Sequence, residues 1–245
     1  MAAALRGARA GGSAVGSGVG RKAAIGRARR GALSAGAPSR SGRGKSRNGA
    51  AQEASILQAA ERVFAGAGFG GATMAAIAAA AGLPKPNLHY YFGSKGALYR
   101  AVLERTLREW LVPMDSIVAE AEPRAALERY IREKMRQSFA RPYASRVWAN
   151  ELLHGAPELH ATLVRTLRPL VRRKAAVIDR WIAEGRMAPL DSVHLFFTIW
   201  AATQTYADFE VQIRAVLGIP RFDRAAQEKA TRHVVALILR GCGLE

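Results

Sequence analysis

Residues 68–99 carry the strongest structural signal in the chain, and they read GFGGATMAAIAAAAGLPKPNLHYYFGSKGALY. Thr73 is suited to cap a short alanine-rich helix, because a threonine side chain accepts a hydrogen bond from a first-turn N–H. Gly82 ends that helix, and Pro84 fits the first turn of the next one, where its missing N–H costs nothing. Two short helices joined by a glycine-containing turn predict a helix-turn-helix.

The second helix of this pair presents donor-bearing side chains of the kind that contact base edges and phosphates. They are Lys85, Asn87, His89 and Tyr90. Thr73 adds the free N–H groups at the start of the preceding helix, and Lys95, at the start of the following helix, adds a positive charge. A small helical hairpin with a solvated polar face is the alternative interpretation of the same spacing.

Upstream of this pair, apolar residues recur at the spacing of one helical face over 56–64. Before them the composition changes: residues 1–50 hold 11 of the 37 Lys and Arg, 12 of the 24 Gly, and no acidic or aromatic residue. Such a segment cannot offset its ordering entropy by burial, so we expect a disordered basic tail over 1–50. Of the total charge of +18, residues 51–245 then carry 26 basic against 19 acidic residues, a net +7.

The composition excludes several classes of protein. A single cysteine, Cys242, excludes an intramolecular disulfide and a cysteine-cluster zinc site. No apolar run approaches the roughly 18–20 residues of a membrane span, and residues 1–30 lack the apolar core of a secretory signal. The acid-free leader also fits an organelle transit peptide, which is the alternative to a tail. We expect no metal, because His154 and His160 are six residues apart, a poor spacing for two metal ligands on one helix. We also expect no cofactor, and no enzymatic activity, since no coherent Ser, His and Asp set is present.

The rest of the chain reads as a series of helices. Ser94 is a second capping candidate, and an apolar stripe follows it from Leu98 to Leu111. Prolines divide the remainder into helix-length intervals, and Pro169 lies inside a helical pattern, where a kink or break is expected. No run of alternating β-branched residues occurs. The sequence therefore predicts an all-α fold, with a helix-turn-helix domain over 51–98 and a second helical domain over 99–245.

Residues 52–99 resemble the DNA-binding domain of TetR-family regulators, most specifically in the run Tyr90-Tyr91-Phe92-Gly93-Ser94-Lys95 and in Leu98-Tyr99. The resemblance implies a bacterial, cytoplasmic homodimer in which residues 85–91 read an inverted-repeat operator from the major groove. It also implies DNA contacts at these positions: Thr73, Lys85, Asn87, His89, Tyr90 and Lys95. His89 stands where the family usually has tyrosine.

Three further segments, 110–113, 144–157 and 195–209, resemble a pyrimidine-sensing branch of the same family. This resemblance implies a uracil-like or thymine-like ligand held by Trp110, Trp200 and Gln204. The chemistry is compatible, because Trp200 and Gln204 share a helical face and a glutamine amide offers one donor and one acceptor in a plane. Asp208 or Tyr206 would orient these groups.

Other interpretations stay open for this half of the chain. The two tryptophans could be core residues, the ligand could be a different small metabolite, or the chain could be a helical ligand-binding or catalytic protein that carries the motif. The resemblance implies a dimer interface in 191–217 and near 223–240 (Val234, Val235, Leu237, Ile238). The basic run over 165–180 fits a solvated helix face better than a second nucleic-acid surface.

Overall fold

The computed structural model describes residues 47–245, and within that range every regular element is helical, which confirms the all-α prediction. Residues 1–46 of the expected basic tail lie outside the described range, and the chain is already helical from Arg47 rather than from 51. The elements are α1 (Arg47–Gly71), α2 (Met74–Ala81), α3 (Lys85–Phe92), α4 (Lys95–Leu111), the 3-10 turn η1 (Val112–Ser116), α5 (Pro123–Ala140), α6 (Pro142–Leu153), α7 (His160–Thr162), the π-helical turn η2 (Leu163–Leu167), α8 (Arg168–Ala183), α9 (Ser192–Asp208), α10 (Glu210–Leu217) and α11 (Arg224–Gly241).

The caps of the first helices follow the sequence prediction. The Thr73 hydroxyl accepts a hydrogen bond from the backbone N–H of Ala76 at 3.0 Å and begins α2. Gly82 ends α2 in the left-handed region, at φ 66°, where a side chain would be strained. The glycine-rich end of α1 carries a kink at Gly68, whose φ is 67°. Local sequence chemistry therefore fixes the helix-turn-helix.

Prolines lie in the first turn of several helices, because proline lacks a backbone N–H and the N–H groups of a first turn have no partner within the helix. Pro86 and Pro169 occupy the first turns of α3 and α8. Pro84, expected in the first turn of α3, lies one residue before it. The break expected at Pro169 takes the form of the π-helical turn η2, which ends at Leu167, two residues before the proline.

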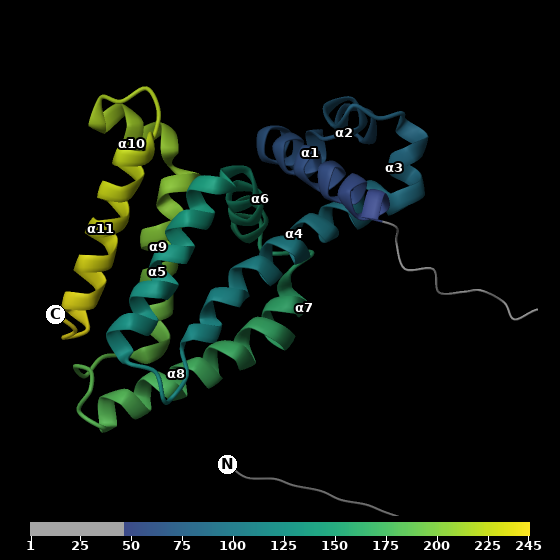
Figure 1. The fold of residues 1–245 in the computed structure, drawn as a ribbon. Helices are drawn as coiled ribbons and strands as arrows, with labels where there is room; N and C mark the ends of the chain where they lie inside the picture. The colour runs from purple at the N-terminus through teal and green to yellow at the C-terminus, as the bar shows by residue number, and fades with distance from the viewer. Residues whose placement is uncertain (1–46) are drawn as a thin grey trace, which may run out of the picture. The chain divides into compact units, whose positions relative to one another are not determined.

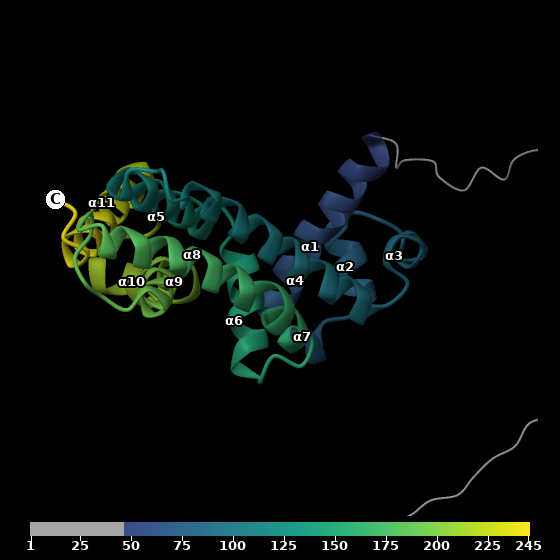
Figure 2. The same ribbon diagram turned by 90° about the horizontal axis from the view of Figure 1, so that it is seen from below.

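Two apolar cores hold the described helices together. One joins α1–α4 to one face of α6 and contains Phe64, Ile77 and Leu88. The other joins α5, α8, α9 and α11 and contains Trp181 and Phe196. Figures 1 and 2 show α4 leading away from the helix-turn-helix toward the other helices, so the predicted boundary at 98/99 falls inside one continuous helix. No helix within residues 47–245 is long and apolar enough to cross a membrane.

The expected dimer residues of α11 divide between two environments. Val234, Val235 and Ile238 are buried in this chain's own core, because they lie on the helical face that packs on the second core. Burial in this chain's own core leaves little of these three side chains for a partner subunit, and the interface over 223–240 stays a prediction. Leu237 is 62% exposed. The region 191–217 also leaves large apolar side chains exposed, among them Val216 at 81%.

Candidate functional site

The outer face of α3 gathers the polar side chains that the sequence predicted for DNA contact. Leu88 is fully buried in the first core and sets the rotation of this short helix. With Leu88 inward, Lys85, Asn87, His89 and Tyr90 are all exposed, and Tyr90 is 85% exposed. We call these four residues the reading face.

The imidazole of His89 is oriented by the backbone. Its Nδ1 lies 2.9 Å from the carbonyl oxygen of Gly93. A carbonyl oxygen only accepts, so Nδ1 carries the proton and donates. The other nitrogen, Nε2, is then an acceptor in the neutral ring and a donor in the charged ring. His89 can therefore accept from a base amino group or, when charged, donate to a phosphate.

Two other predicted DNA contacts make hydrogen bonds within the protein. The Thr73 hydroxyl caps α2, as described above. The Lys95 ammonium donates to the carbonyl oxygens of Phe69 at 2.8 Å and Ala72 at 3.0 Å, and lies 4.6 Å from the centroid of the Phe69 ring. These bonds satisfy carbonyls left open beside the glycine-rich end of α1. The geometry gives Lys95 a structural role at that position.

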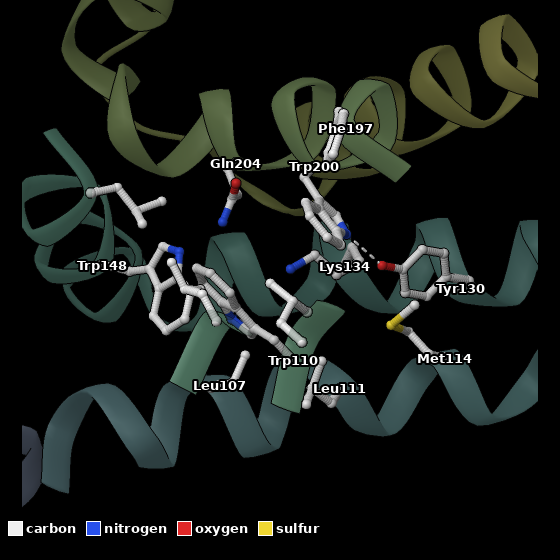
Figure 3. A pocket seen from close by; sticks show the side chains of 13 residues that line it. Leu107, Trp110, Leu111, Met114, Tyr130, Lys134, Trp148, Phe197, Trp200 and Gln204 are labelled. Carbon is white, nitrogen blue, oxygen red and sulfur yellow. Dashed lines mark hydrogen bonds between the residues drawn. The ribbon is translucent and has the colours of Figure 1, made fainter. Parts of the chain in front are cut away.

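A cavity of about 300 Å³ lies among α4, α5, α6, η2 and α9 (Figure 3). Trp110, Trp200 and Gln204 all line it, so the structure brings together the three residues expected to hold a ligand. The other lining residues are mostly apolar: Leu107, Leu111, Met114, Tyr130, Lys134, Trp148, Leu152, Leu163, Leu167 and Phe197. Figure 3 shows the Gln204 amide and the Lys134 ammonium directed into the same space.

Trp200 is held in place by a partner that the sequence did not reveal. Its indole N–H donates to the hydroxyl oxygen of Tyr130 at 2.7 Å, and burial raises the pKa of Tyr130 well above its usual range. The Tyr130 O–H therefore stays protonated and keeps one hydrogen to donate. Trp200 thus serves the cavity as a rigid wall, with its single donor already used.

Lys134 and Trp148 were also missed by the sequence reasoning. The Lys134 ammonium lies 4.0 Å from the centroid of the Trp110 ring, and Trp148 packs against Trp110 at 5.4 Å between ring centroids. A usable signal existed, because Lys134 occupies the buried face of α5 one turn after Tyr130. A lysine on an apolar helical stripe is unusual enough to mark a site.

The two residues expected to orient the ligand groups lie elsewhere. Tyr206 packs on Phe139 and Phe222, with ring centroids 5.7 and 6.0 Å away, and does not line the cavity. Asp208 does not line the cavity either, but its charge acts on Lys134. Burial raises the pKa of Asp208. Neither residue touches the cavity, so an orienting role for Tyr206 or Asp208 would be exerted from behind the lining residues and stays a prediction.

A buried hydrogen-bond cluster joins the cavity wall to the helix-turn-helix end. Glu151 lies one turn after Trp148 on α6 and is 3% exposed. Its carboxylate accepts from the Tyr99 hydroxyl of α4 at 3.0 Å and from the backbone N–H groups of Glu158 and Leu159 at 2.6 and 3.2 Å. We call these contacts the Glu151 clasp. Tyr99 in turn packs against aromatic rings of α1.

An ion-pair cluster makes a second connection between the same regions. Arg141 pairs with Glu61 of α1 and with Glu109 of α4. Glu109 directly precedes the cavity residue Trp110, and its backbone carbonyl accepts from the Gln137 amide at 3.0 Å. The helices α4 and α6 thus both line the cavity and contact the DNA-binding helices.

Comparisons with known proteins agree with this architecture. Residues 56–102 match the family described as "Bacterial regulatory proteins, tetR family", and residues 103–245 match "YcdC-like protein, C-terminal region". The chain is 42% identical over 197 residues to the HTH-type transcriptional regulator RutR of Escherichia coli K12, covering 80% of this chain and 93% of that protein. It is 27% identical over 192 residues to the HTH-type transcriptional repressor NicS of Pseudomonas putida, covering 76% and 90%.

Solved structures share the fold at lower identity. A TetR-like regulator from a Rhodococcus species superposes with a TM-score of 0.57 at 22% identity, covering 78% of this chain and 96% of that one. The TetR-family regulator PfmR from Thermus thermophilus superposes with a TM-score of 0.59 at 19% identity, covering 76% and 94%.

Proposed function

This chain belongs to the TetR family of bacterial transcription regulators, and we propose that a small pyrimidine, uracil or thymine, controls its affinity for operator DNA and thereby the genes of pyrimidine breakdown. Its matched relatives are regulators that cover most of its length, so it is not an enzyme that happens to carry the motif. We expect it to act in the bacterial cytoplasm, where its operator is found.

The observation that carries the ligand assignment is the convergence of Trp110, Trp200 and Gln204 on one cavity. Its volume, about 300 Å³, lies at the small end of the roughly 300–1,000 Å³ of ligand pockets, which favours a single ring over a chain or several rings. Indole walls suit a flat ligand. The Gln204 amide can pair with a ring edge that carries both N–H and C=O groups.

We propose that the reading face enters the major groove from each subunit of a homodimer. Regulators of this family bind DNA as dimers, and the exposed apolar side chains of α9–α11 supply a surface for a two-fold interface. An inverted repeat then places the two reading faces in successive major grooves, about 34–36 Å apart. Lys85 and Asn87 are the residues that we expect to set sequence preference.

Ligand control requires a coupling free energy between the cavity and the reading face. A pyrimidine in the cavity contacts α4 through Trp110 and α6 through Trp148. Both helices also hold the helix-turn-helix end, through the Glu151 clasp and the Arg141 cluster. We propose that the ligand shifts α4 and α6 together and thereby changes the spacing of the two reading faces.

Titration calorimetry with uracil, thymine, cytosine and adenine tests the ligand assignment. We expect saturable binding of uracil or thymine, and a raised melting temperature at saturation, because a ligand that binds only the folded state stabilises it. If uracil and thymine give no heat of binding and no shift in melting temperature, while a purine or another metabolite binds, the cavity would be reassigned to a different effector.

A further inference from the structure

Lys134 is a cation in an otherwise apolar part of the molecule. The residue is 2% exposed, and it lies on the face of α5 that also carries Tyr130 and Ile131 into the interior. Lysine is almost never fully buried unless it is paired. Its position in the cavity wall therefore calls for a chemical reason.

No protein group within the described residues satisfies this ammonium by a hydrogen bond or a close ion pair. Its nearest electrostatic contact there is the ring face of Trp110, at 4.0 Å. Asp208 of α9 attracts the charge from farther away, and Tyr130 is the other titratable group that lines the cavity. Burial lowers the pKa of Lys134 to about 7, so the empty cavity disfavours the charged form.

We propose that Lys134 is a ligand-contacting residue that donates to an acceptor oxygen of the bound ring, and that it restricts the cavity to rings that present a carbonyl or anionic oxygen at that position. This inference rests on the proposed pyrimidine ligand. The ammonium has three donors and no acceptor, and Figure 3 shows it directed into the cavity between Gln204 and Trp110. A ring oxygen placed there accepts a charge-assisted hydrogen bond, which is stronger than a neutral one.

Lys134 should destabilise the protein when the cavity is empty and stabilise the complex when a pyrimidine is bound. Without ligand, the buried and unpaired ammonium destabilises the protein, since an apolar group of similar size there avoids the cost of desolvation. With ligand, the same ammonium gains its partner. Lys134→Met should therefore raise the melting temperature of the empty protein and weaken pyrimidine binding. A lysine with a purely structural role would lower the melting temperature when it is replaced.

A protein–ligand double-mutant cycle tests the contact directly. Uracil, 2-thiouracil and 4-thiouracil are titrated into the wild type, Lys134→Met and Lys174→Met. Each thio compound replaces one carbonyl oxygen by sulfur, which is a weaker acceptor. Lys174 is the matched control, because it donates to the Ile117 carbonyl outside the cavity.

We expect uracil affinity to fall about 10- to 100-fold in Lys134→Met, the range of a hydrogen bond to a charged group, and to stay within about twofold in Lys174→Met. One of the two sulfur substitutions should weaken binding to the wild type and have a smaller effect in Lys134→Met. Equal sulfur effects in both proteins, or a lower melting temperature of empty Lys134→Met, would overturn the contact while leaving the pyrimidine assignment intact. Absence of uracil and thymine binding in the wild type would instead overturn the assignment, and the inference with it.

Discussion

Asn87 and Lys95 were both predicted to contact DNA, but their surroundings differ. Asn87 is exposed on the reading face, whereas Lys95 donates to carbonyl oxygens at the end of α1. We expect Asn87→Ala to leave the melting temperature unchanged and to lose about 1–3 kcal/mol of discrimination at one operator base pair. Lys95→Met should lower the melting temperature and weaken binding to every sequence alike. Gel-shift titrations on single-base operator variants, with melting curves, measure both effects.

These two variants also test whether Asn87 reads DNA while Lys95 stabilises the fold. A Lys95→Met protein that melts normally but loses preference for one base pair would show that Lys95 reads DNA. An Asn87→Ala protein with full operator preference would show that the reading face is placed on the wrong residues.

The lowered pKa of Lys134 makes the stability of the empty protein depend on pH. Between about 7 and the ordinary value of 10.5, the unfolded lysine holds its proton while the folded one loses it. The unfolded state then binds more protons, so this lysine makes the free energy of unfolding rise with pH across that window. Urea unfolding at pH 7 and pH 9 should show a larger gain for the wild type than for Lys134→Met. Equal gains would place the Lys134 pKa near its ordinary value.

Among individual residues, the sequence predicted those that a local pattern or a family resemblance identifies. Trp110, Trp200 and Gln204 came from the resemblance, and the structure places them in one cavity. Lys134 and Tyr130 were missed because their significance depends on what the neighbouring helices bring opposite them. The bonds of Lys95 to the protein were missed for the same reason, since its carbonyl partners lie more than 20 residues away in sequence.

The Glu151 clasp connects the cavity wall on α6 with the DNA-binding helices. Glu151→Gln keeps the shape but replaces one accepting oxygen by a donating amide, which leaves a buried donor unpaired at a cost of about 1–3 kcal/mol. We expect a lower melting temperature, uracil affinity within about threefold of wild type, and a smaller effect of uracil on operator binding. Calorimetry and gel shifts on the same preparation separate these quantities.

Arg100→Gln is the matched control for this variant, because it removes an ion pair with Glu158 at the same turn. Arg100 is 50% exposed, and exposed pairs contribute little, so this control should keep full coupling. An unchanged uracil effect in Glu151→Gln would mean that the clasp stabilises the fold without transmitting the ligand signal.

The elements themselves were predictable where caps and prolines determine them. Thr73, Gly82 and Ser94 delimit the first helices as expected. The packing of α6 between α4 and α9 was not predictable, because no local pattern encodes which face of an amphipathic helix meets which neighbour. The burial of Val234, Val235 and Ile238 in this chain's own core was not predictable either, since apolar residues over 234–238 suit a core and a dimer surface equally well.

At the scale of the whole molecule, charge is concentrated in the N-terminal segment. Residues 1–46 hold 10 Lys and Arg and no acidic residue, and they directly precede α1. We expect this segment to add sequence-independent affinity, because each neutralised phosphate releases counterions and adds about 0.9 to the salt slope. Deleting 1–46 should flatten the dependence of operator binding on salt and leave operator choice unchanged. An unaltered salt slope would show that these charges do not contact DNA.

A pyrimidine in the cavity is proposed to control DNA binding by the dimer, and operator affinity with and without saturating uracil measures that control. Fluorescence anisotropy on the full chain should show affinity at least tenfold weaker with uracil, which corresponds to a coupling of about 1.4 kcal/mol. Gln204→Leu, which cannot pair with the ring edge, should bind operator normally and fail to release it at the same uracil concentration. An operator affinity that does not change while calorimetry shows the cavity saturated with uracil would mean that the pyrimidine does not control DNA binding.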